Sequence, residues 1–336
     1  MTPRQALLEI QDLTVTFPTQ DGEVKAVRGV DLTLDAGNVL GVVGESGSGK
    51  SVTMMAVMGL LPRSARITGS VKFRGEELVG LPRHEMRQYR GKQIAMIFQD
   101  PMTSLNPVFT IGFQIGEAIR VHDHTVTKEQ AKRQAVDLLA LVGIPQPQHR
   151  VDAYPHEFSG GMRQRAMIAM AMANDPALLI ADEPTTALDV TIQAQILDVL
   201  ETVRREKNVG IALITHDLGV IAGMVEQVTV MYAGQVVEQG LVDDVFYKSC
   251  HPYTRGLLAS LPRLDEGGET RLTPIRGTPP SLIRLPGGCS FHPRCPNAQP
   301  LCVEDEPLLR VVGPVRSRCH YAEELGTDAE PARSLA

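Results

Sequence analysis

The sequence predicts an α/β fold in which buried parallel strands alternate with helices. Short apolar runs at 39–43, 94–98 and 178–181 have the length and composition of strands that are buried on both faces. The first run leads directly into the segment Gly44-Glu45-Ser46-Gly47-Ser48-Gly49-Lys50-Ser51, and no Gly or Pro interrupts residues 51–58. A strand, a glycine-rich loop and a helix in this order are the framework of the G-x-x-x-x-G-K-S motif.

The residue types of this motif suit a loop that holds phosphate groups. Glycines allow backbone angles that turn successive N–H groups inward, and the following helix points its positive end at the same place. In this pattern Lys50 reaches the β- and γ-phosphates, and the Ser51 hydroxyl is a ligand for Mg²⁺. A glycine-rich turn without a ligand is the alternative, and the strand–loop–helix context argues against it.

The composition is that of an ordinary globular protein of about two domains. The chain has 336 residues, 43% of them hydrophobic, with a formal net charge of -6 and a pI of about 5.9. Because no bulk positive field is present, we expect no nucleic-acid partner. We expect no signal peptide, because residues 1–5 lead into no apolar segment, and no apolar run approaches the ~18 residues of a membrane span. We therefore expect a cytosolic chain that meets a membrane only through partners.

The first part of the chain predicts an antiparallel β subdomain. Residues 7–17 and 24–34 alternate polar and apolar side chains, and Asp21-Gly22 between them is a turn signal. Phe17 ends the first of these runs. Its ring suits either packing in the core or stacking on an adenine base, and the pattern alone favours the core.

A helical subdomain is predicted at about 100–175. Residues 110–121 and 128–142 have helical patterns, the second with an apolar stripe. Further on, Ser159, Gly160 and Gly161 precede a helical run over 162–174. This start is either a second anion-binding helix terminus or an ordinary helix cap.

Polar residues follow closely after three apolar runs of the chain. Gln99 follows the run 94–98, Asp182 and Glu183 follow 178–181, and His216 comes after the run 211–214. An Asp at the carboxyl end of a parallel strand suits Mg²⁺ coordination in a P-loop protein. Glu183 is placed to accept a proton from an attacking water. For His216 alone, a structural loop histidine is the alternative.

In this order, the motifs resemble the ATP-binding cassette of ABC transporters over residues 7–240. The segment 158–162 differs at both flanks from the usual Leu-Ser-Gly-Gly-Gln signature loop but keeps its Ser-Gly-Gly. The resemblance implies that ATP is bound by Phe17, Gly44, Glu45, Ser46, Gly47, Ser48, Gly49, Lys50, Ser51, Val52, Gln99 and His216. It implies the catalytic residues Glu183, His216 and Gln99, the Mg²⁺ ligands Ser51, Gln99 and Asp182, and Asp189 in the D-loop 187–189. The signature residues, which act on the ATP of a partner cassette, would be Ser159, Gly160, Gly161, Met162 and Gln164.

A narrower resemblance covers the chain to about Tyr321. The segments 99–107, 251–254 and 291–296 resemble the ATP-binding subunits of oligopeptide and dipeptide importers. This implies a RecA-like core with an N-terminal antiparallel β subdomain, an inserted helical subdomain and a C-terminal extension. It also implies a second ATPase subunit in a heterodimer, two membrane permeases and an extracytoplasmic peptide-binding protein, and hence a place at the cytoplasmic face of the membrane. A nickel or glutathione importer and a soluble ABC ATPase are the alternatives.

We expect a cassette domain over 1–250 and a loop-rich extension over 251–336, with the last ~12 residues disordered. The extension contains Cys289, Cys295, Cys302 and Cys319, whereas Cys250 is expected to be an ordinary buried thiol. A cytosolic chain should not use these residues as structural disulfides, and their spacing is not that of paired C-x₂-C zinc knuckles. The resemblance implies a [4Fe–4S] cluster. Zinc, with His292 or His320 as spare ligands, and free buried thiols are the alternatives.

Overall fold

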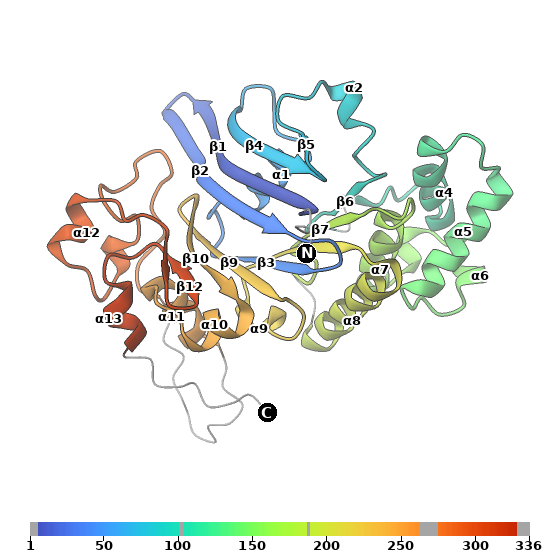
Figure 1. Cartoon of the computed structure of the whole chain (residues 1–336). Helices are drawn as coiled ribbons and strands as arrows, with labels where there is room; N and C mark the ends of the chain where they lie inside the picture. Colours follow the sequence, from blue (N-terminus) through green and yellow to red (C-terminus); the bar gives the residue numbers. More distant parts are fainter. Residues whose placement is uncertain (1–5, 101–103, 187–188, 262–274, 328–336) are drawn as a thin grey trace, which may run out of the picture. The chain divides into compact units, whose positions relative to one another are not determined.

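The computed structural model describes residues 6–100, 104–186, 189–261 and 275–327 (Figure 1). Through these residues the chain forms two compact units. Unit 1 comprises Met1–Leu8, Thr33–Val39 and Phe73–Ile214, and unit 2 comprises Glu9–Leu32, Leu40–Lys72 and Thr215–Ala336. The domain boundary predicted near residue 250 lies inside unit 2, so the C-terminal residues pack with the N-terminal part of the chain.

Unit 1 contains three neighbouring parallel strands, with β7 (Leu178–Asp182) between β6 (Ile94–Ile97) and β8 (Gly210–Thr215). Every residue of β7 and β8 is buried. This burial on both faces explains why the two segments are continuous apolar runs in the sequence. Because the three strands run in the same direction, their carboxyl ends meet at one edge of the sheet.

The helices of unit 1 include the predicted helical subdomain, drawn in green in Figure 1. Its two main helices, α4 (Ile111–His122) and α5 (Lys128–Leu141), lie close to the predicted ranges, and Thr127 and Gln130 form a capping box at the start of α5. The remaining elements of the unit are β5 (Glu76–Glu77), α2 (Arg83–Met86), α6 (Pro147–Arg150), η1 (Pro155–Glu157), α7 (Gly160–Ala171) and α8 (Val190–Lys207).

Unit 2 begins with the predicted antiparallel region, in which β1 (Leu8–Thr19) lies between β2 (Gly22–Leu34) and β4 (Arg66–Phe73). Buried and more exposed residues alternate along much of β1, as expected for a sheet with one face on the core. The P-loop strand β3 (Val39–Val43) is wholly buried, pairs in parallel with β9 (Gln227–Tyr232), and is followed by α1 (Lys50–Val57).

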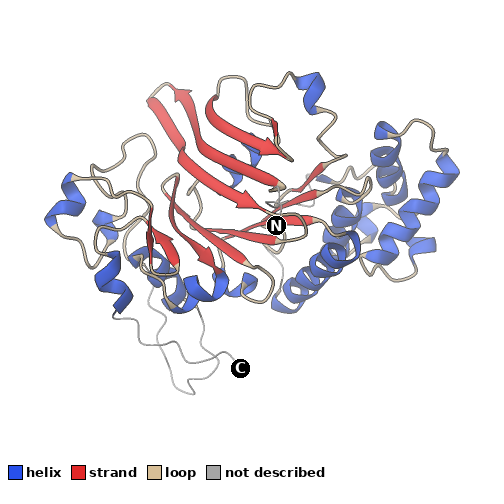
Figure 2. Cartoon of the chain, viewed as in Figure 1, coloured by secondary structure: helices blue, strands red, loops and turns tan. Residues whose placement is uncertain are grey.

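The C-terminal region extends the sheet of unit 2. Strand β10 (Gln235–Leu241) pairs with β9 and, on its other side, with β12 (Val315–Ser317), which in turn pairs with β11 (Arg310–Val312). Long loops separate its short elements, as Figure 2 shows in tan. The helices of this part are α9 (Leu218–Ile221), α10 (Val242–Tyr247), α11 (Pro252–Ala259), η2 (His292–Arg294), α12 (Pro300–Glu304) and α13 (Ala322–Thr327).

The helices and the C-terminal end of the described chain bear on two expectations from the sequence. Across the described ranges, the helices are too short or too polar to cross a bilayer. Helix α13 continues to Thr327, within the segment that was expected to be disordered, while residues 328–336 lie outside the described part of the chain.

Candidate functional site

The P-loop, residues 44–51, forms the predicted connection between β3 and α1 in unit 2. Gly44, Gly47 and Gly49 all have positive φ angles, of 155°, 78° and 102°. A Cβ atom on Gly44 would lie 2.2 Å from the Met231 carbonyl oxygen. The loop therefore needs glycine both for its backbone angles and for its close approach to β9.

The Lys50 side chain turns back into the P-loop. Its ammonium group donates hydrogen bonds to the carbonyl oxygens of Gly44 (2.7 Å) and Glu45 (3.0 Å), and the residue is only 5% exposed. Gly49 is the N-cap of α1, and Lys50 is the first residue of the helix. A buried cation inside a loop at a helix N-terminus is an arrangement that suits an anionic ligand.

Two carboxylates lie at the end of β7 in unit 1. Asp182 is the last residue of the strand, is 6% exposed, and is paired in register with Ile214 of β8. Glu183 follows with a positive φ of 48°, and its backbone N–H donates to the Ile214 carbonyl at 2.9 Å. This left-handed residue turns the chain sharply out of the strand.

The Glu183 carboxylate is held by two side chains of unit 1. Its Oε2 atom accepts hydrogen bonds from Gln99 Nε2 (3.0 Å) and from the Thr186 hydroxyl (2.7 Å). Sequence reasoning predicted Gln99 and Glu183 separately, and the structure brings them into direct contact. It did not predict Thr186, although the residue stands three positions after Glu183 in the turn that leaves the strand.

The predicted signature residues lie at the start of α7 in unit 1. Ser159 is the N-cap, and its hydroxyl accepts from the Met162 N–H at 3.4 Å. Gly160 and Gly161 belong to the first turn, so the helix begins two residues earlier than predicted. Gln164 is 2% exposed, and its amide nitrogen has no hydrogen-bond partner among the described residues.

Other predicted residues occupy ordinary positions in their elements. Phe17 lies inside β1, which continues to Thr19, and its side chain is half-buried. His216 follows β8 and is exposed. Asp189 caps α8 by accepting from the Ile192 N–H at 2.9 Å, whereas Ala187 and Leu188 of the predicted D-loop lie outside the described residues.

Two residues of the C-terminal region after residue 250, Tyr253 and Arg294, contact the P-loop. Arg294 forms a two-pronged ion pair with the Glu45 carboxylate, at 2.6 and 2.9 Å, and the Tyr253 hydroxyl accepts from the Glu45 N–H at 2.8 Å. Sequence reasoning used Tyr253 and Arg294 only as parts of family motifs. No local pattern indicates a contact between residues so far apart in the chain.

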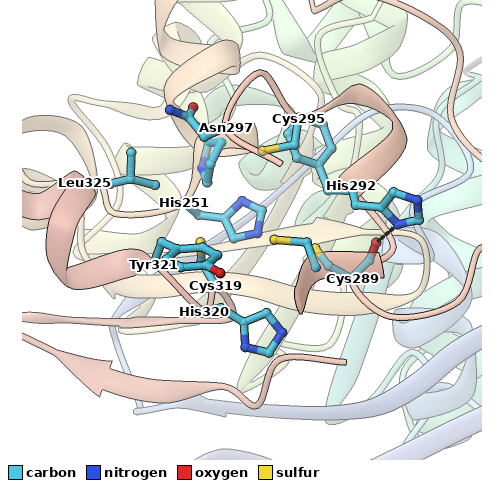
Figure 3. Close-up of a pocket in the computed structure, with 12 residues that line it drawn as sticks. His251, Cys289, His292, Cys295, Asn297, Cys319, His320, Tyr321 and Leu325 are labelled. Carbon is cyan, nitrogen blue, oxygen red and sulfur yellow. Dashed lines mark hydrogen bonds between the residues drawn. The ribbon is translucent and has the colours of Figure 1, made fainter. Parts of the chain in front are cut away.

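The predicted cysteines gather around one pocket of unit 2. Cys289, Cys295, Cys302 and Cys319 all line it, together with His251 (Figure 3). All five cysteines of the chain are free, and Cys250 is buried, as expected. The C-terminal loops thus bring together thiols that are separated in the sequence.

Ionisation of these thiols is unfavourable in the structure. Burial raises the pKa of Cys295 to about 11 and that of Cys319 to about 12, and neighbouring cysteines add to both shifts. Burial also lowers the pKa of His251 to about 3, so its imidazole is neutral. These groups therefore carry little charge at neutral pH.

In the part of the chain that the structure describes, no group of three or more His, Cys, Asp or Glu side chains is positioned to hold a metal ion. A single zinc ion needs four donors about 2.0–2.3 Å from one point. Among the described residues, the side-chain positions therefore support neither a zinc site at the cysteines with His292 or His320 nor the expected [4Fe–4S] cluster as a preformed metal site. His292 instead contacts the Cys289 carbonyl through Nδ1 at 2.9 Å, as Figure 3 shows.

The sequence and the fold match known families and solved structures. Residues 27–186 match the ABC transporter family, and residues 237–302 match the C-terminal region of oligopeptide/dipeptide transporters. The fold resembles the dimeric structure of the ATP-binding cassette MJ0796 bound to ADP and Pi, with a TM-score of 0.63 at 24% identity over 70% of this chain and 98% of that one. It also resembles cbiO1 from Clostridium perfringens, part of the ABC transporter complex cbiONQ, with a TM-score of 0.61 at 25% identity over 72% of this chain and 91% of that one. The fold is that of an ATP-binding cassette.

Sequence similarity to known relatives identifies the family more narrowly than the fold does. The chain is 55% identical to the oligopeptide transport ATP-binding protein OppD of Escherichia coli over 95% of both chains. It is also 55% identical to the OppD protein of Bacillus subtilis, over 94% of this chain and 88% of that one. The chain spans 52% of the length of the OppD protein of Mycobacterium bovis, also at 55% identity and over 94% of this chain. The chain belongs to the family of oligopeptide and dipeptide ABC transporter ATP-binding subunits.

Proposed function

We propose that this chain is an ATP-hydrolysing subunit that powers the import of di- and oligopeptides across the cytoplasmic membrane. The observation that carries the proposal is the P-loop, with its three glycines at positive φ and the buried Lys50 ammonium at the start of α1. Such a loop suits the phosphates of ATP. The peptide substrate is supported by relatives whose names are oligopeptide or dipeptide transport proteins.

In this proposal Glu183 orients or deprotonates the water that attacks the γ-phosphate. Its carboxylate accepts hydrogen bonds from Gln99 and Thr186, which limits the orientations available to it. Gln99 and His216 respond to the γ-phosphate, and Phe17 stacks on the adenine. The half-buried position of Phe17 in β1 leaves part of its surface accessible for stacking.

The Mg²⁺ ion that accompanies ATP would be held by Ser51, Gln99 and Asp182. Their hydroxyl, amide and carboxylate oxygens are the donors that Mg²⁺ prefers, and Asp182 lies at a strand end, as in other P-loop proteins. When bound, the ion would neutralise part of the charge of the phosphates. Asp182 and Ser51 would hold it in place through their oxygen atoms.

The catalytic assembly in this proposal is a dimer of two cassettes. Ser159, Gly160, Gly161 and Met162 at the start of α7 would bind the ATP held by the P-loop of the partner, and Asp189 would lie at the same interface. The predicted Gln164 is buried, so it would support the start of the helix and not touch the nucleotide. A helix N-terminus with two glycines in its first turn suits an approaching phosphate. The MJ0796 cassette, which has the same fold and is described as dimeric and bound to ADP and Pi, supports a dimeric assembly.

The permeases and the binding protein complete the proposed importer. The chain would lie at the cytoplasmic face of the membrane and transmit ATP-driven closure to two permease subunits. The segment after Gln99 would carry this motion, and its residues 101–103 lie outside the described ranges. Loss of the γ-phosphate would open the dimer, since ATP and ADP stabilise it to different extents.

We further propose that Cys289, Cys295, Cys302 and Cys319 hold a [4Fe–4S] cluster. Support comes from the four cysteines that line one pocket, because four cysteine thiolates are the ligand set that such a cluster takes. The protein residues would supply thiolates, so their protons must be released on binding.

Anaerobic purification tests the cluster. We expect iron and acid-labile sulfide in wild-type protein, their loss in Cys295→Ser, and their retention in the matched variant Cys250→Ser. Wild-type protein without iron and sulfide would contradict the cluster. Zinc in place of iron and sulfide would support the alternative that the cysteines bind zinc.

Peptide uptake tests the transport function. Cells that carry Glu183→Gln in place of the wild-type residue should lose uptake of labelled di- or oligopeptides. Unchanged peptide uptake would contradict peptide import, and uptake of labelled nickel and glutathione would then be measured with the same strains. Loss of ATP hydrolysis with normal peptide uptake would separate the enzyme activity from this substrate.

A further inference from the structure

Glu45 of the P-loop is held at three of its groups. Arg294 binds both carboxylate oxygens, Tyr253 accepts from the backbone N–H, and Lys50 donates to the carbonyl. Lys50 belongs to the P-loop itself, but Tyr253 lies in α11 and Arg294 in η2. The C-terminal region thus holds the first variable residue of the phosphate-binding segment.

Arg294 is itself tightly placed. Its side chain is 5% exposed, and its guanidinium carbon lies 5.7 Å from the ring centre of Tyr232 and 6.0 Å from that of Phe291. Its Nε donates to the Arg276 carbonyl at 3.0 Å. A buried guanidinium fixed by rings and a carbonyl presents its two remaining nitrogens in a set direction.

The charges explain why the P-loop needs this contact. Glu45 places a negative carboxylate in a loop whose proposed ligand is a polyanion. Arg294 neutralises this carboxylate and hydrogen-bonds both of its oxygens. Without Arg294, the free carboxylate would repel the phosphates, and the Glu45 backbone would lose one of its anchors.

We propose that Arg294 and Tyr253 are positioning residues of the P-loop, through which the C-terminal region sets the affinity of the cassette for nucleotide. This inference rests on the proposed ATPase function. Phe291 packs against Tyr253, with ring centres 5.3 Å apart, and also lines the four-cysteine pocket. The same contacts therefore connect that pocket to the nucleotide-binding loop.

Nucleotide binding to the purified full chain tests the proposal, with Kd values for ATP and ADP measured by calorimetry. We expect Arg294→Gln to weaken ATP binding about tenfold, Arg294→Lys to weaken it less, and Tyr253→Phe to weaken it about threefold. The double variant Glu45→Gln/Arg294→Gln should recover most of the lost affinity, because no unpaired carboxylate remains. A purely structural role for Arg294 would not produce this recovery.

Glu306→Gln is the matched control. Glu306 also belongs to the C-terminal region and pairs with Arg28 of β2 at 2.8 Å, so the variant removes an ion pair that does not involve the P-loop. Its Kd for ATP should equal that of the wild type. Thermal melting without nucleotide identifies any variant that fails to fold, and Arg294→Lys then provides the comparison.

The outcomes separate this proposal from the ATPase function. If the wild type binds ATP and both Arg294→Gln and Arg294→Lys bind it with the same Kd, the positioning role is overturned and the ATPase function is left intact. A double variant as weak as Arg294→Gln would overturn the electrostatic explanation. Failure of the wild-type chain to bind ATP would instead contradict the proposed function.

Discussion

Gln99 Nε2 donates a hydrogen bond of 3.0 Å to Glu183 Oε2. The two residues follow β6 and β7, which are parallel neighbours, so their side chains leave the sheet at the same edge. Thr186 donates to the same oxygen at 2.7 Å. The residue proposed as the base thus contacts the residue proposed to respond to the γ-phosphate.

Glu183→Gln should retain ATP binding but reduce hydrolysis by ~10²–10⁴-fold, because the amide cannot accept a proton from water. Phosphate release measures hydrolysis, and nucleotide titration measures binding. Glu201→Gln is the control, since Glu201 is a helix carboxylate of the same unit paired with Arg204 at 2.7 Å. Near-normal turnover in Glu183→Gln would remove Glu183 from this role.

Lys50→Ala should weaken ATP binding by about 10–100-fold, because a buried ammonium that suits the phosphates is lost. We expect the Kd for ATP to rise while the melting temperature without nucleotide stays close to that of the wild type. Lys248→Ala removes an exposed lysine that pairs with Asp244 at 2.8 Å and serves as the control. Equal affinities of the two variants would contradict a phosphate-binding role for Lys50.

The P-loop glycines should differ in their tolerance of alanine. Gly44→Ala should disrupt the loop and abolish nucleotide binding, because its Cβ would lie 2.2 Å from the Met231 carbonyl. Gly47→Ala meets no atom within 4 Å, and only its φ of 78° is unfavourable for alanine, at about 1–2 kcal/mol. Melting temperature and affinity for ATP should both decrease from wild type to Gly47→Ala and from Gly47→Ala to Gly44→Ala. The reverse ranking of the two variants would contradict this geometry.

Glu238 should make folding stability depend on pH. This carboxyl group of β10 is fully buried, and it accepts from the Ser249 hydroxyl and from the N–H groups of Cys250 and His251. Burial raises its pKa from 4.5 to about 7. The folded state therefore binds more protons than the unfolded state between these values, and this contribution to stability is lost as the pH rises towards 7.

His251 acts in the opposite direction at lower pH. Its pKa is lowered to about 3, so the unfolded state binds the extra proton and stability increases between pH 3 and 6.5. The two slopes oppose each other where they overlap, which hides the effect of Glu238 in the wild type.

Glu238→Gln separates the two contributions. The melting temperature of the wild type minus that of Glu238→Gln should fall as the pH rises from 5 to 8, with a change in relative stability on the order of 3 kcal/mol. Glu323→Gln, which removes an exposed carboxylate paired with Arg310, is the control for added charge effects. A constant difference across this pH range would show that Glu238 does not titrate there.

Local patterns predicted most of the elements that carry the site. The apolar runs of β3, β7 and β8 are wholly buried strands, and the P-loop connects β3 to α1 as its motif requires. These features depend on residues next to one another in the chain. Helix starts were predicted less well, since Gly160 and Gly161 lie inside α7 rather than before it.

The sequence by itself determined the strand, loop and helix of the P-loop, because local composition encodes them, and the order of its motifs resembles a family that implies the cassette fold and the other residues proposed to bind and hydrolyse ATP. Only the tertiary structure decided which distant residues support them. Arg294 and Glu45 are 249 positions apart, and their pairing depends on how β12 joins β10 and places the C-terminal loops. Burial and charge complementarity select such partners after the chain has folded, and no period or motif in the sequence records them.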